Sequence, residues 1–185
     1  MSAYQYGGKE LANAFRTVRK NTVQIAEDIP ESSYDFVAAP EVRPVAHMLV
    51  HVAISTRIWE EVNKKRLTTL VGFDFLGTIE RFHAEEVKPR SKAEIVNLLK
   101  SEGEQFAAWL ETLTPEFLAE TVTEADGKMV KTRFERLLGA KEHEMHHRAQ
   151  VMLVERQLGI VPHVTRQFQE RMAQMRAAQA QGASA

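Results

Sequence analysis

The 185-residue sequence contains no cysteine, which excludes disulfide bonds, zinc–thiolate sites and a cysteine nucleophile. Any thiol chemistry would therefore need a thiol from another molecule. The formal net charge of −1 gives the chain no overall attraction for nucleic acid or for an acidic membrane surface. No apolar run is long enough to span a bilayer, and charged residues interrupt the N-terminal region where a signal peptide needs an apolar stretch. We therefore expect a cytoplasmic protein without a membrane or nucleic-acid partner.

Strand-like alternation is also nearly absent, and the apolar residues instead recur at helical spacing. The length predicts one domain with a substantial core. Long segments with the spacing of amphipathic helices cover residues 8–29, 44–65, 91–113 and 132–158. Pro44 suits a first helical turn, Ser91 and Glu94 have capping-box spacing, and Gly159 follows the last segment as a stop signal.

The connections between these helices differ in length. More than twenty residues separate the second helix from the third, which permits a crossover so that these two helices run parallel. A small hairpin around the Asp126-Gly127 turn fits the sequence of residues 121–131. We predict an all-α four-helix bundle with long connections over residues 1–163. A C-terminal helical tail over residues 164–185 would follow it, with frayed ends at residues 181–185.

Histidines stand out within this pattern. Residues 143–147 read His-Glu-Met-His-His, and His143 and His147 interrupt the apolar stripe of the last long helix. Side chains four residues apart on a helix share one face, so both imidazoles should point into the bundle. His47 and His51 have the same spacing on the second helix. Because a buried imidazole needs a partner, three of them on two packed helices can hold a divalent ion and leave a coordination position open.

The same string also matches the His-Glu-x-x-His signature of zinc proteases, in which Glu144 would be the general base. The longer metzincin signature continues with a glycine and a third histidine. This chain has Gln150 and Leu153 at those two positions. The near absence of strands also removes the sheet edge on which such enzymes bind peptides, so we do not favour a protease.

Two blocks of the sequence resemble the DinB/YfiT-like family. Residues 143–150, followed by Leu-Gly-Ile-Val-Pro at residues 158–162, are similar to the last helix of that family and its exit. Residues 43–53 resemble the family's first metal-ligand block, in which the ligand is the histidine before a hydrophobic–alanine pair. That histidine corresponds to His51. The resemblance covers about residues 8–162.

The resemblance implies a four-helix bundle of up-down-down-up topology with one divalent metal ion, zinc or nickel, held by His51, His143 and His147. His47 would either support His51 or replace it. Characterised relatives imply a transferase or isomerase that uses a low-molecular-weight thiol such as glutathione, bacillithiol or mycothiol on a small-molecule substrate. The alternatives are a metal-dependent hydrolase and a non-catalytic bundle that binds a metal or a small ligand. Because such bundles often pair through a helix face, we expect a homodimer.

The other histidines and Trp59 are expected to have structural roles. His146 lies about 100° around the helix from His147 and should be outside the metal site. His83 and His163 are expected in surface loops, and Trp59 in the core.

Overall fold

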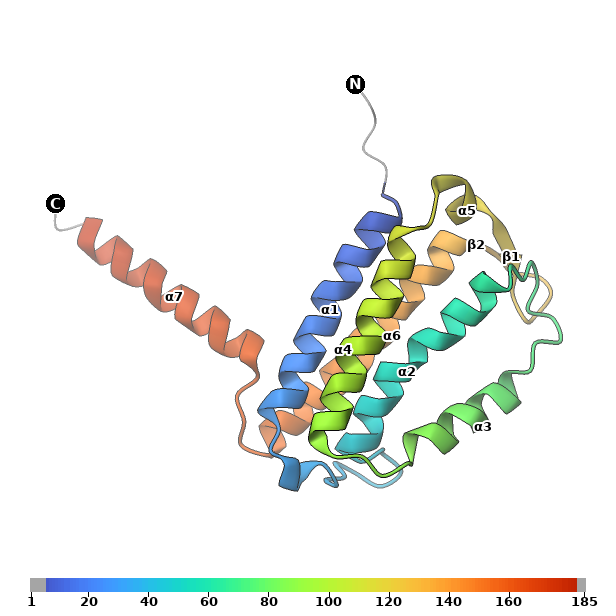
Figure 1. Ribbon diagram of the computed structural model, residues 1–185. Coiled ribbons are helices and arrows are strands. Elements are labelled where there is room, and N and C mark those ends of the chain that lie inside the picture. Colours follow the sequence, from blue (N-terminus) through green and yellow to red (C-terminus); the bar gives the residue numbers. More distant parts are fainter. Residues whose placement is uncertain (1–5, 183–185) are drawn as a thin grey trace.

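The computed structural model describes residues 6–182 and has the all-α four-helix bundle that the sequence predicts (Figure 1). The bundle helices are α1 (Gly8–Asp28), α2 (Val45–Lys64), α4 (Lys92–Glu111) and α6 (Arg133–Gln157). The shorter elements and the last helix are η1 (Glu31–Ser33), α3 (Phe75–Glu86), α5 (Pro115–Ala119), β1 (Thr121–Thr123), β2 (Val130–Thr132) and α7 (His163–Gly182). The capping boxes at Ser91 and Thr132 explain why α4 and α6 begin where they do.

The bundle has the up-down-down-up topology. In Figure 1, α1 (blue) and α6 (orange) run downward, whereas α2 (cyan) and α4 (yellow-green) run upward. Both α1 and α2 pack against α4 and α6, so α1 and α2 occupy opposite corners of the bundle. Helices α2 and α4 are therefore parallel neighbours, and the long connection between them provides the crossover that this requires.

That crossover contains α3, a helix that the sequence analysis did not predict. Asp74 caps α3 by accepting a hydrogen bond from the backbone N–H of Gly77. The helix packs along α2 on the outside of the bundle (Figure 1). His83 therefore lies in a helix and not in a loop, although it is exposed as expected. By covering one side of α2, α3 adds a wall beside the bundle.

A buried ion pair connects all four bundle helices. Arg19 of α1 donates through Nε to both carboxylate oxygens of Glu144 on α6, at 2.9 and 3.0 Å. Its other nitrogens donate to the carbonyl oxygens of Leu99 on α4 and Val52 on α2, at 2.8 and 3.1 Å. Thr22 donates to Glu144 at 2.7 Å, so the pair has well-placed partners throughout.

The predicted hairpin is formed by β1 and β2, which pair antiparallel with Val122 opposite Lys131. Beyond the bundle, α7 projects away from it (Figure 1). The prediction that His163 is a surface loop residue is wrong: His163 begins α7, is only 4% exposed, and places Nε2 3.1 Å from Oδ1 of Asn21. The predicted fraying of residues 181–185 falls largely outside the described residues. No helix within residues 6–182 is both long and apolar enough to cross a membrane.

Candidate metal centre

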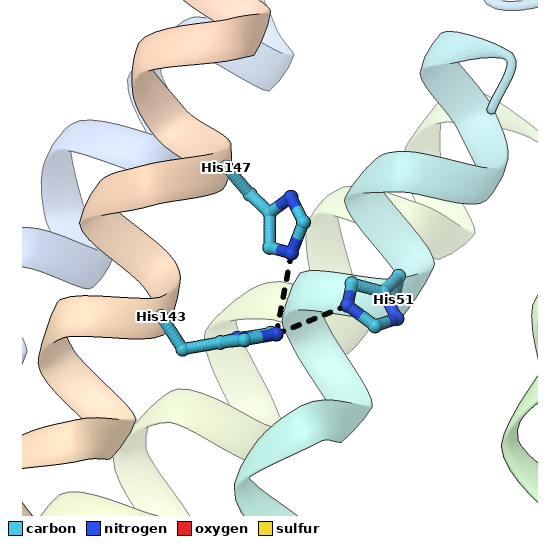
Figure 2. A group of neighbouring side chains, drawn as sticks. All are labelled: His51, His143 and His147. Atoms are coloured by element: carbon cyan, nitrogen blue, oxygen red, sulfur yellow. Dashed lines mark hydrogen bonds between the residues drawn. The ribbon is translucent and has the colours of Figure 1, made fainter. Parts of the chain in front are cut away.

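His51 of α2 and the pair His143 and His147 of α6 point toward one another across the two facing helices (Figure 2). Nε2 of His143 lies 3.1 Å from Nε2 of His51 and 3.2 Å from Nε2 of His147. We call these three residues the histidine triad. His47 lies one turn earlier on α2 and lines a different cavity, whose wall also includes Lys88. The structure thus brings His51, and not His47, to the pair on α6.

The outer nitrogens of two triad rings face hydrogen-bond acceptors. Nδ1 of His51 lies 2.5 Å from a carboxylate oxygen of Glu86, and Nδ1 of His147 lies 2.8 Å from the side-chain oxygen of Gln150. A neutral imidazole that donates through Nδ1 has only a lone pair on Nε2. With all three rings neutral, Nε2 of His143 carries at most one proton. That proton can form a hydrogen bond to Nε2 of His51 or of His147, but not to both. A cation at the centre of the triad satisfies all three nitrogens.

The spacing of the triad also fits a metal ion. Zinc–nitrogen bonds of 2.0–2.1 Å in a tetrahedral site place the ligand nitrogens about 3.3 Å apart. The separations of 3.1 and 3.2 Å lie close to this value. All three candidate ligand atoms lie within 4.8 Å of one another, and each side chain is only partly exposed. The donor set and its geometry therefore suit a divalent ion bound by imidazole nitrogen.

The surroundings of His143 and His147 favour the neutral imidazoles that a metal needs. Burial, together with the neighbouring His147 and His51, lowers the pKa of His143 to about 3. Burial also lowers the pKa of His147, against the hydrogen bond to Gln150. Although burial by itself raises the pKa of Glu86, hydrogen bonds from His51 and Arg43 lower it below its usual value. Glu86 therefore stays a carboxylate that can orient His51.

Comparison with known proteins identifies the family. The family model described as the DinB superfamily matches residues 14–151. This chain belongs to the DinB superfamily. The match confirms the resemblance inferred from the sequence blocks around His51 and His143. A comparison with curated proteins found no match.

Three solved structures share the fold of this DinB superfamily member. YfiT from Bacillus subtilis, described as a probable metal-dependent hydrolase with an unusual four-helix bundle topology, is 18% identical, with a TM-score of 0.64 over 86% of this chain and 91% of that chain. A DinB-like protein, YjoA, from Bacillus subtilis is 21% identical, with a TM-score of 0.60 over 81% and 92% of the two chains. An uncharacterised protein from Clostridium difficile 630 is 15% identical, with a TM-score of 0.62 over 83% and 98%.

Glu86 is a site residue of this DinB superfamily member that the sequence analysis missed. It lies near the end of α3, is only 2% exposed, and accepts a second hydrogen bond from Nε of Arg43 at 2.8 Å. Carboxylates that hold the outer nitrogen of a metal-ligating histidine fix its tautomer and raise its basicity. No sequence pattern pointed to Glu86, because α3 itself was not predicted and no nearby motif in the chain relates Glu86 to His51.

The remaining ring of the triad is oriented by packing. Within residues 6–182, Nδ1 of His143 is buried without a hydrogen-bond partner. The ring of Trp59 lies beside it, with 5.6 Å between the ring centroids. Trp59 was expected in the core, and it does pack on the core cluster around Phe106, but one side of it faces the histidine triad. His146 is exposed and outside the triad, as expected.

Glu144, the second residue of the protease-like string, faces away from the triad. Its carboxylate is buried against Arg19 and Thr22 in the middle of the bundle, and only 1% of the residue is exposed. Both carboxylate oxygens are thus engaged on the α1 side of α6. Glu144 has a structural role in this family member, which agrees with the sequence argument against a protease site.

A cavity of about 310 Å³ adjoins the triad between α2, α3 and α6. His51 and His143 line one part of it. The other walls are mainly apolar and come from α2 and α3, namely Ile58, Trp59, Val62, Phe75, Ile79 and Phe82. The volume is at the lower end of the usual range for small-molecule sites, about 300–1,000 Å³. A small molecule bound there would touch the two triad histidines directly.

Proposed function

We propose that the chain is an enzyme that holds one divalent metal ion with His51, His143 and His147. The observation that carries the proposal is the convergence of the Nε2 atoms of the three rings. Glu86 and Gln150 hold the outer nitrogens of His51 and His147, and Nδ1 of His143 is buried. Zinc and nickel are the ions we propose, because imidazole nitrogen suits both. The description of the similar protein YfiT as a probable metal-dependent hydrolase supports a catalytic role.

Three protein ligands leave coordination positions open, as in catalytic sites. The ion would supply Lewis acidity, which lowers the pKa of a water or thiol that binds to it. The residues of the chain would orient the reaction. Glu86 holds the proton on Nδ1 of His51, and Arg43 keeps Glu86 ionised through its hydrogen bond. The apolar side chains of α3 and Trp59 would limit access of bulk water to the substrate.

Two reaction classes follow from different observations. The family resemblance favours a transferase or isomerase that uses a low-molecular-weight thiol, and the absence of cysteine means that such a thiol must be a cosubstrate. The description of YfiT instead favours hydrolysis. In either case the cavity beside the triad suits a small-molecule substrate. We also propose a homodimer, which light scattering would test. A closed metal site without an exchangeable ligand would favour the non-catalytic alternative.

Metal analysis of the purified protein tests the central claim. Wild-type protein loaded with zinc or nickel and then dialysed should retain about one ion per chain, whereas the His143→Ala/His147→Ala and His51→Ala variants should lose it. His83→Ala is the matched control, because His83 is exposed on α3 outside the triad. Equal and negligible metal in wild type and in the triad variants would contradict the proposal. Assays with glutathione, bacillithiol or mycothiol and an electrophile, compared with ester and amide hydrolysis, would then separate the two reaction classes.

A further inference from the structure

Helix α3 is anchored to the bundle near its two ends. Phe75, its first residue, packs against the small apolar cluster around Val122 of β1, and Phe82, two turns later, packs against the larger core cluster. Glu86, its last residue, accepts the two hydrogen bonds described above. Between these anchors, Ile79 lines the cavity beside the triad. The middle of α3 thus forms one wall of that cavity.

This wall leaves apolar surface uncovered. Ile79 lines the cavity and yet is 60% exposed, and Phe75 and Phe82, which also line it, are only partly buried. On the facing helix α2, Ile58 and Trp59 are partly buried as well. The removal of apolar surface from water is favourable in proportion to the area removed. A ligand with an apolar body would therefore gain affinity by covering these side chains.

The charged groups that line the cavity are already engaged within the protein. Arg136 of α6 is the lining residue with a permanent charge. Its guanidinium pairs with Glu124 through Nη1, and its Nε is buried and so unavailable to a ligand. His51 and His143 are the candidate metal ligands. Among residues 6–182, the cavity walls thus offer no free charge, and a charged group away from the triad would lose its hydration without gaining a counter-charge.

The volume of the cavity limits the size of the ligand. About 310 Å³ corresponds to roughly ten water-sized groups, at about 30 Å³ each. That is the size of a single ring with a short substituent. Because His51 and His143 belong to the same lining as Ile79, one such molecule would contact both the triad and α3.

We infer that the cavity binds an uncharged ligand with an apolar body of about one ring, and that Ile79 determines this preference by covering the apolar body from the α3 side. In a clause that rests on the proposed function, this ligand is the substrate, and its reacting group faces His51 and His143. The preference for an apolar and uncharged body depends only on the cavity walls.

Titrations with acetamide, phenylacetamide and phenylacetate, followed by NMR spectroscopy, test the inference. Wild type, with or without zinc, should bind phenylacetamide at least about tenfold more tightly than acetamide, because burial of the phenyl ring removes apolar surface from water. In the metal-free protein, phenylacetamide should also bind at least about tenfold more tightly than phenylacetate, which has the same size but would bury an unpaired charge. The metal-free protein is used for this comparison because a carboxylate can bind the ion itself.

Substitution of Ile79 tests the role of α3. Ile79→Ser should weaken the binding of phenylacetamide by several fold and leave that of acetamide unchanged, because the apolar contact from α3 is lost. Leu76→Ser is the matched control, since Leu76 is 77% exposed on the same helix and is not among the residues that line the cavity. Both side chains are largely exposed, so neither substitution should prevent folding.

Three results would overturn the inference. The first is equal affinity of wild type for acetamide and phenylacetamide, or no binding of phenylacetamide. The second is tighter binding of phenylacetate than of phenylacetamide by the metal-free protein. The third is an Ile79→Ser variant with the affinities of wild type.

Metal content measured on the same samples separates this inference from the proposed function. Selective binding of phenylacetamide by a protein that retains no metal would support the inference and refute only the proposed metal enzyme. A protein that retains its zinc but does not prefer phenylacetamide to acetamide would refute only the inference.

Discussion

The buried pair of Arg19 and Glu144 predicts a large loss of stability when Glu144 is replaced by glutamine. The substitution keeps the size of the side chain and an acceptor for Thr22, but it removes the negative charge beside a guanidinium that is 5% exposed. The hydrogen bonds from Arg19 to the carbonyl oxygens of Leu99 and Val52 do not replace that charge. Glu144→Gln therefore leaves a buried cation without its counter-ion.

Removing one partner of a buried ion pair costs about 3–5 kcal/mol. For a chain of this size, each kcal/mol corresponds to about 2–4 °C, so the melting temperature should fall by roughly 6–20 °C. Urea unfolding and thermal melting followed by circular dichroism measure this loss. Glu142→Gln is the control, because Glu142 is exposed on the same helix, and its effect should stay within about 0.5 kcal/mol.

Metal content gives the second measurement. Because Glu144 faces α1 and not the triad, Glu144→Gln should bind as much metal as wild type at a temperature where both are folded. A variant with wild-type stability would refute the argument that the ion pair holds the four helices together. A variant that is stable but has lost its metal or its activity would show that Glu144 belongs to the functional site, as the protease-like string first suggested.

Two further predictions concern buried carboxylates. Glu86→Gln should weaken metal binding about 10- to 100-fold, because it removes the charge that orients His51. Competition with a chromophoric chelator measures this affinity, with Glu85→Gln as the control, and an unchanged affinity would contradict the role of Glu86. Burial, and then the charge of Asp28, raise the pKa of Glu155 to about 7. The folded state therefore holds a proton between about pH 4.5 and pH 7 that the unfolded chain has lost, so this group makes stability fall as the pH rises through that window. Glu155→Gln should accordingly melt above wild type at pH 8 and close to it at pH 4.5, and an equal difference at both pH values would refute this assignment.

Much of the fold was predictable from local pattern. The bundle helices follow from apolar spacing and from caps such as Ser91 and Gly159, and each predicted boundary lies within two residues of the observed one. The hairpin followed from the Asp126-Gly127 turn. Helix α3 was missed because its apolar residues, including Leu76 and Ile79, are largely exposed and its sequence lies between two glycine- and proline-containing loops.

The candidate site was likewise predictable only in part from local sequence pattern. The sequence by itself determined that His143 and His147 share one helix face, because positions four apart are neighbours on any α-helix. The helical spacing left His47 and His51 as rivals, since it does not state how α2 is rotated toward α6. The family resemblance pointed to His51, and the tertiary packing brings His51, and not His47, to the pair on α6.

Packing also brought Glu86 from α3 to the outer nitrogen of His51 and placed Ile79 beside a cavity that α2, α3 and α6 enclose together. The sequence thus determined the helices and the metal-binding face of one of them, because both depend on residues close together in the chain. The tertiary structure decided the rotation that brings His51 to the pair, the carboxylate behind it and the cavity, because these depend on contacts between segments far apart in the chain.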